Sequence, residues 1–185
     1  RYYVLKRIIV DNLYGVDIMD EAVEICKLRL FLKMVSQVEQ VTQIEPLPDI
    51  DFNIRAGNTL VGFATRGEID PPLSQGYRLY NPKEVLAQIE VMEGTLKNFR
   101  VALMRSETTA VDLKKTKANI HRILGDIRAN LDAALMQDYG LNDLPAFRAS
   151  HKPFHWYVEF NSVLAGGGFD VIVGNPPYVE LRAVD

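Results

Sequence analysis

The clearest hydrophobic pattern lies in the middle of the chain, where apolar residues recur at alternating spacings of four and three. One series runs from Val85 to Leu103, and a second runs from Leu113 to Ala134. Sustained four-three spacing is typical of a helix that packs along a seam against another helix. The two series therefore predict an antiparallel helical hairpin over residues 83–140, which we expect to pack on itself and project from the rest of the molecule.

Shorter apolar runs before the hairpin predict alternating helices and strands. Residues 2–10 favour a helix, 13–18 a buried strand and 20–36 a second helix with Asp20 as its N-cap. A further short strand is predicted at 52–56. Helix, strand and helix in this order are typical of an α/β sheet with helices on its faces. We therefore assign residues 1–82 to an α/β core, in which 64–82 is a proline-rich connector.

Residues 141–185 are expected to return to this α/β core. The aromatic stretch 145–160 is predicted to be irregular, and 169–173 (Phe-Asp-Val-Ile-Val) is apolar enough for a central strand of a parallel sheet. Asn175-Pro176-Pro177-Tyr178 then ends that strand, because proline cannot continue a central strand.

Composition and charge narrow the classes of function. The chain is 48% hydrophobic and 24% charged with a net charge of -3, which excludes a wholly disordered chain and a disulfide scaffold. A compact module that binds nucleic acid by charge alone should be strongly basic, so we expect any such contact to be local or to come from parts of the protein outside this sequence. The single cysteine, Cys26, fits a reducing compartment, and we expect a cytoplasmic protein. No apolar stretch is long enough to predict a membrane partner.

The Asn-Pro-Pro-Tyr tetrapeptide is the strongest candidate for chemistry. Its prolines hold the backbone rigid at the carboxyl end of the predicted sheet, where α/β folds bind ligands. Asn175 offers an oxygen acceptor and Tyr178 an aromatic face. The alternative, a stiff turn beside a surface tyrosine, is the weaker interpretation after such an apolar run.

Asp17 is a second candidate, because an acidic residue at the carboxyl end of a strand is a general device for binding ribose hydroxyls. Its carboxylate can accept hydrogen bonds from both hydroxyl groups. The alternative is a helix-capping or surface carboxylate, and Asp20 is expected to provide the cap.

Four stretches of the sequence resemble one enzyme family. FDVIVGNPPY at 169–178 is similar to the catalytic motif of N6-adenine DNA methyltransferases that use S-adenosylmethionine. NLYGVDI at 12–18 and NIRAGNTLVG at 53–62 resemble their cofactor-side motifs, and FHWYVEF at 154–160 resembles the segment before the catalytic motif. The spacing most resembles large bacterial restriction-modification proteins, in which a methylase domain is fused to other domains.

This resemblance implies a partial Rossmann-like sheet with the hairpin inserted, S-adenosylmethionine as cofactor, and double-stranded DNA with a flipped adenine as substrate. The implied catalytic residues are those of the tetrapeptide: Asn175, Pro176, Pro177 and Tyr178. The implied cofactor-binding residues are Asp17, Ile18 and Asn58. Many relatives carry Asp at the position of Asn58, which can still accept through its side-chain oxygen.

Two other functions remain open from the sequence. The same tetrapeptide serves methyltransferases of glutamine side chains and of guanine in ribosomal RNA, which are typically compact where this chain carries its long insert. A noncatalytic interaction module built on the hairpin is the other alternative. Apolar surface residues outside the seams would favour it, and the sequence has few of them.

Two further clusters favour structural roles. His151, His155 and Glu159 are spaced by four, but Pro153 breaks a helix there, so we expect packing and no metal site. Lysines near the hairpin tip are expected to form a solvated helix face: Lys114, Lys115 and Lys117.

The chain begins at Arg1, and the resemblance does not include the family's glycine-rich first motif. We therefore expect an excised fragment that binds S-adenosylmethionine weakly and does not methylate DNA by itself. Unpaired strand edges would make self-association of such a fragment one expected outcome.

Overall fold

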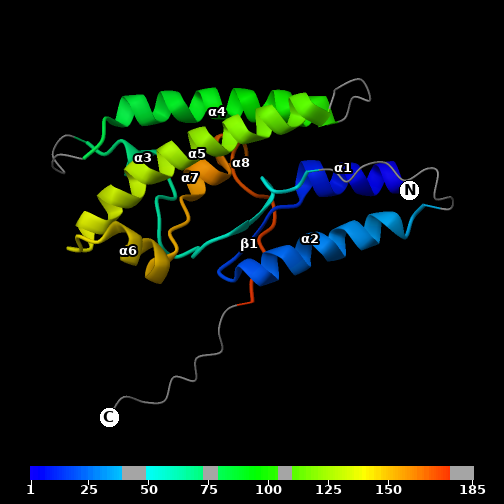
Figure 1. Cartoon of the computed structure of the whole chain (residues 1–185), viewed down its shortest axis with the longest axis horizontal. Helices are drawn as coiled ribbons and strands as arrows, with labels where there is room; N and C mark the ends of the chain where they lie inside the picture. Colours follow the sequence, from blue (N-terminus) through cyan, green and yellow to red (C-terminus); the bar gives the residue numbers. More distant parts are fainter. Residues whose placement is uncertain (39–48, 73–78, 104–109, 176–185) are drawn as a thin grey trace, which may run out of the picture.

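The computed structural model describes residues 1–38, 49–72, 79–103 and 110–175, which form a mostly helical protein around a small parallel sheet (Figure 1). The elements before the hairpin are α1 (Tyr2–Asn12), β1 (Gly15–Asp17), α2 (Asp20–Val35), β2 (Ile54–Ala56) and α3 (Arg66–Ile69). The hairpin helices are α4 (Pro82–Leu103) and α5 (Ala110–Asp138). Three short helices follow: α6 (Leu144–His151), α7 (Trp156–Glu159) and α8 (Asn161–Ala165). No helix in the described part of the chain is long and apolar enough to cross a membrane.

The two strands are parallel, with Gly15 opposite Ile54 and Asp17 opposite Ala56. The two strands predicted before the hairpin are confirmed, in shorter form. Helix α2 packs against both strands, and α1 packs against α2. The buried side-chain amide of Asn53 holds α1 to β2. Its Nδ2 donates to the Val10 carbonyl at 2.9 Å and to the Leu13 carbonyl at 3.0 Å. This arrangement agrees with the predicted α/β class.

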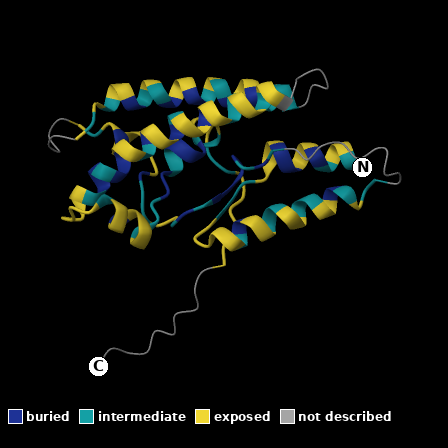
Figure 2. Cartoon of the chain, in the orientation of Figure 1, coloured by how far each residue is buried: buried dark blue, intermediate teal, exposed yellow. Residues whose placement is uncertain are grey.

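The two heptad series form α4 and α5, which lie side by side and run in opposite directions (Figure 1). Most of their seam positions are buried, as the spacing predicts (Figure 2), and those nearest the hairpin tip, Leu103 and Leu113, are half-buried. The buried seam residues are Val85, Ile89, Met92, Leu96, Phe99, Ile120, Leu124, Ile127, Leu131 and Ala134.

The expectation that the hairpin projects from the sheet is wrong. Its seam belongs to one hydrophobic cluster with residues of the other elements, among them Phe52, Phe63 and Val158. The Phe52 ring meets the Phe99 ring edge-on, with the centroids 5.8 Å apart. A pair of helices leaves apolar surface on either side of its seam, and aromatic side chains of the α/β part cover that surface.

Ion pairs attach the same hairpin to α2. Lys117 of α5 pairs with Asp49 at 2.5 Å and also with Asp51, while Lys27 of α2 pairs with Asp51 at 2.7 Å. The expectation of a fully solvated lysine cluster is therefore wrong for Lys117, although Lys114 and Lys115 are exposed. A lysine at the end of a seam reaches acidic residues that lie far away in the sequence.

The strand predicted at 169–173 is not formed. Val171 and Val173 are 77% and 89% exposed, and the described residues contain one sheet, made of β1 and β2 alone. A strand forms only when a neighbour receives its backbone hydrogen bonds, and none of the described strands lies beside this run.

The stretches predicted as irregular contain short helices. Thr65 and Glu68 form a capping box at α3, and the Asp143 side chain accepts from the Ala146 amide at the start of α6. Both are ordinary helix-start patterns. Asp20 is not the N-cap of α2, because the helix begins at Asp20 and Met19 occupies the N-cap position.

We expect Leu96→Asp to lower the free energy of unfolding by about 3 kcal/mol or more, because it buries an unpaired charge in the seam. Chemical denaturation followed by circular dichroism measures the change. Val91→Asp in the same helix is the control, since Val91 is 62% exposed and should change the stability by less than about 0.5 kcal/mol. Equal losses for both variants would contradict the seam assignment.

Stability should also depend on the Asp51 carboxylate at acidic pH. Burial alone would raise its pKa, but Lys117 and Lys27 outweigh burial and lower the pKa from 3.8 to about 2. The stabilisation is therefore complete above the unfolded pKa and is lost as the pH falls through the folded pKa. Solvent screening reduces it to about 1 kcal/mol. The difference in unfolding free energy between the wild type and Asp51→Asn should shrink by about half between pH 7 and pH 3. A difference that stays constant over this range would contradict the linkage.

Candidate active site

The carboxyl ends of β1 and β2 form one edge of the parallel sheet. Asp17 is the last residue of β1, and its carbonyl oxygen accepts from the Gly57 amide at 2.9 Å. Asn58 follows directly, so the strand pairing brings two of the predicted cofactor residues to the same edge. Ile18 lies beside them and is 49% exposed.

The Asp17 carboxylate is exposed, and one of its oxygens already has a local partner. Its Oδ1 accepts from the Met19 amide at 2.8 Å, which shapes the turn into α2. The argument that Asp20 frees Asp17 from such a role is therefore wrong. A carboxylate has further acceptor capacity, however, so a local bond leaves room for a ligand hydroxyl.

A lysine that the sequence did not single out completes this edge. The Lys152 ammonium donates to the Ile18 carbonyl at 3.0 Å and lies 3.4 Å from Asp20. The backbone carbonyl of Lys152 accepts from the backbone N–H of Asn58 at 2.7 Å. Lys152 ends α6 in the left-handed conformation, with φ at 45°. No spacing rule in the sequence connects it to β1, because the contact spans most of the chain.

The loop from Gly57 to Phe63 (the cofactor-side loop) pairs closely with residues 152–157. The Phe154 amide donates to the Val61 carbonyl at 2.7 Å, and the Trp156 indole donates to the Thr59 carbonyl at 3.0 Å. A Cβ atom at Gly62 would lie 2.2 Å from the Phe154 carbonyl oxygen, so only glycine permits this approach. Two of the motifs that carry the family resemblance are thus in direct contact.

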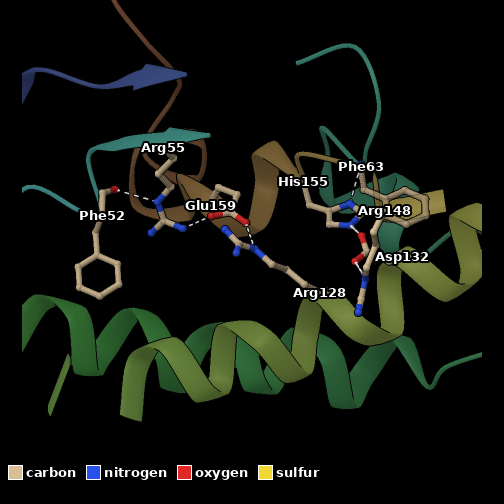
Figure 3. Close-up of polar contacts among 8 residues, drawn as sticks. All are labelled: Phe52, Arg55, Phe63, Arg128, Asp132, Arg148, His155 and Glu159. Carbon is tan, nitrogen blue, oxygen red and sulfur yellow. Dashed lines mark hydrogen bonds and ion pairs between the residues drawn. The ribbon is translucent and has the colours of Figure 1, made fainter. Parts of the chain in front are cut away.

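A buried carboxylate lies behind this pair of segments. Glu159 accepts from Arg55 of β2 and from Arg128 of α5 (Figure 3), and the Arg128 Nε lies 2.5 Å from the Glu159 Oε1. The Arg55 Nε also donates to the Phe52 carbonyl at 3.2 Å. Burial lowers the pKa of both arginines, but the shared carboxylate stabilises their charged forms. These ion pairs therefore join β2, α5 and α7 next to the cofactor-side loop.

A second buried polar contact lies one helical turn away (Figure 3). His155 Nδ1 accepts from the Phe63 amide at 3.1 Å, and His155 Nε2 lies 2.9 Å from Asp132 of α5. His155 and Glu159 therefore serve as packing and hydrogen-bonding residues. The described part of the chain contains no cluster of three or more His, Cys, Asp or Glu residues that could hold a metal ion.

The segment that leads to Asn175 begins against an aromatic cluster. Phe169 packs edge-on against Tyr14, Phe160 and Trp156, with centroid distances of 5.7, 5.8 and 6.2 Å. Asn175 is exposed, and Pro176, Pro177 and Tyr178 lie outside the described residues. The start of the 169–175 segment is thus anchored near the cofactor-side loop, because Trp156 contacts both Phe169 and Thr59.

The family model of the Eco57I restriction-modification methylases matches residues 11–185. The chain belongs to this family. It is 32% identical to a putative type II restriction enzyme and methyltransferase of Methanocaldococcus jannaschii, over 97% of this chain and 20% of that protein. This methylase-family chain therefore spans about a fifth of the length of that curated relative. No solved structure matches it.

We expect Gly62→Ala to destabilise the protein by about 2 to 3 kcal/mol, because its Cβ overlaps the Phe154 backbone. Separation of the two segments should also change the fluorescence of Trp156, the only tryptophan in the sequence. Gly125→Ala is the control: it lies inside α5 in open space, and alanine should stabilise the helix by about 1 kcal/mol. Unchanged stability and fluorescence in Gly62→Ala would contradict the close pairing.

Proposed function

We propose that this methylase-family protein is a DNA methyltransferase of a restriction-modification system that transfers a methyl group from S-adenosylmethionine to adenine N6. One observation carries the proposal: the parallel strands bring Asp17 and Asn58 together at the carboxyl edge of the sheet. Ligands of open α/β sheets bind at this edge. The family match supports a DNA acceptor over glutamine side chains or ribosomal RNA.

The residues at this edge fit S-adenosylmethionine by their chemistry. The exposed Asp17 carboxylate can accept from ribose hydroxyls, and the Asn58 amide oxygen can accept from the adenine amine. Exposed Ile18 offers apolar surface to the adenine ring. Lys152 holds the Ile18 carbonyl and so fixes the turn that carries these groups. The bound cofactor supplies an electrophilic methyl group.

The catalytic motif then activates the adenine amine. That amine is a poor nucleophile because its lone pair is delocalised into the ring, and a duplex hides it until the base is flipped out. The Asn175 side-chain oxygen and the Pro176 carbonyl accept the two amine hydrogens. Pro177 keeps the backbone rigid, and Tyr178 stacks on the flipped base, which contributes about 1 to 3 kcal/mol. The hydrogen bonds strengthen as the amine gains positive charge, so they favour the transition state over the ground state.

The alternative of a separate helical interaction module has less support. The hairpin shares its hydrophobic cluster with Phe52, Phe63 and Val158, and its Arg128 pairs with Glu159 behind the sheet edge. We therefore assign the hairpin a supporting role within the methyltransferase.

Asn175→Ala in the natural full-length protein should lower the rate of methyl transfer by about 100-fold or more, because it removes an acceptor used in the transition state. Single-turnover transfer of a labelled methyl group to unmethylated genomic DNA measures the rate. Calorimetry should show unchanged affinity for S-adenosylmethionine, since Asn175 contacts the base.

Asp17→Ala is the matched control and should give the opposite pattern. Its dissociation constant for S-adenosylmethionine should rise about tenfold or more, because it loses a charged hydrogen bond. Its transfer rate at saturating cofactor should stay close to that of the wild type. Near-normal single-turnover methylation by Asn175→Ala would overturn the proposed mechanism.

A further inference from the structure

His155 connects the hairpin to the cofactor-side loop through both of its ring nitrogens. A backbone N–H can only donate, so the Phe63 amide requires Nδ1 to be an acceptor. The proton of the neutral ring must then lie on Nε2, where it is donated to the Asp132 carboxylate at 2.9 Å. The two contacts therefore select one tautomer. The ring is 1% exposed and stacks on the Phe63 ring at 5.3 Å.

This burial excludes a direct chemical role for His155. Both ring nitrogens are occupied, so neither is available to bind a metal or to move a proton at a substrate. The ring instead holds the backbone in place, because it accepts from the amide of Phe63, the last residue of the cofactor-side loop. Asn58 lies in the same loop, and its amide is bonded to the Lys152 carbonyl.

Asp132 is itself fixed in place. Its Oδ1 accepts a hydrogen bond from His155 Nε2 and its Oδ2 accepts from Arg148 Nε of α6 at 2.6 Å, so both oxygens have partners. The Asp132 side chain is 8% exposed. A buried acceptor with two fixed donors holds the imidazole in one orientation and one tautomer.

We propose that Asp132 of the hairpin is a positioning residue for the cofactor site: it fixes the His155 tautomer that holds Phe63, and so places the loop that carries Asn58. The inserted hairpin thereby sets the affinity for S-adenosylmethionine. This inference rests on the proposed function, in which Asn58 lies beside the cofactor.

Asp132→Asn tests this with a defined change of tautomer. Arg148 Nε–H can only donate, so it takes the amide oxygen and leaves the amide nitrogen facing His155 Nε2. Nε2 must then accept, the proton moves to Nδ1, and two N–H groups face each other at Phe63. We expect the dissociation constant for S-adenosylmethionine, measured by calorimetry on the natural full-length protein, to rise about tenfold.

His155→Asn provides the rescue. The amide oxygen of asparagine occupies the place of Nδ1 and can accept from Phe63 without help from Asp132. We expect its cofactor affinity to stay near that of the wild type, and adding Asp132→Asn to it should cause no further loss. His155→Gln places its amide near Nε2, removes the acceptor that His155 Nδ1 offers to the Phe63 amide and should weaken binding like Asp132→Asn.

Lys117→Met is the control for general loosening of the hairpin. It breaks the ion pairs to Asp49 and Asp51, and should lower the melting temperature while leaving the cofactor affinity unchanged. The positioning role is overturned if Asp132→Asn and His155→Gln bind S-adenosylmethionine as tightly as the wild type. It is also overturned if Asp132→Asn weakens cofactor binding in the His155→Asn variant as much as it does in the wild type. Should Asp132→Asn fail to fold, the contrast between His155→Asn and His155→Gln decides. A wild-type protein that binds no S-adenosylmethionine would instead overturn the proposed function itself.

Discussion

The buried carboxylate of Glu159 is the constraint on which the rest of the structure depends. Its side chain is 1% exposed, and a carboxylate in such a place is stable only when it is paired and hydrogen-bonded. Arg55 comes from β2 and Arg128 from α5, so the pairing requires strand, hairpin and α7 to assemble together. The cofactor-side loop begins just after β2, and its geometry therefore follows from this assembly.

Local patterns in the sequence are sufficient to predict much of the fold. The four-three spacing identifies α4 and α5 and most of their buried residues, because the neighbours of a helical position lie within one turn. Short apolar runs locate β1 and β2, and the polar residues after them fall at one sheet edge because parallel strands place their carboxyl ends together. Asp17 follows from such a local pattern, whereas Asn58 is implied by the family resemblance alone, and the strand pairing brings the two to the same edge.

The features that sequence reasoning missed depend on partners far along the chain. Residues 169–173 have the composition of a central strand but no described neighbour to pair with, so composition alone predicts the wrong state. Lys117 has the spacing of a seam residue, and only the fold places Asp49 and Asp51 beside it. The spacing of His155 and Glu159 is compatible with a metal site, whereas their actual partners lie on α5 and β2. The starts of α3 and α6 are different, because their capping residues are local signals that sequence reasoning could have used.

The position of the hairpin in the sequence explains why it is so firmly attached. It lies between the loop that begins at Gly57 and the segment that begins at Lys152, which pair with each other directly. If the insert were a long flexible loop, pairing the two segments would cost closure entropy, and this cost grows with the length of the loop. The two segments would then separate more easily. The antiparallel pair of α4 and α5 returns the chain towards the point where it left the loop, and Arg128 and Asp132 then hold the second segment from one face of α5. In this arrangement the hairpin acts as the structural link that holds the two segments together at the carboxyl edge of the sheet.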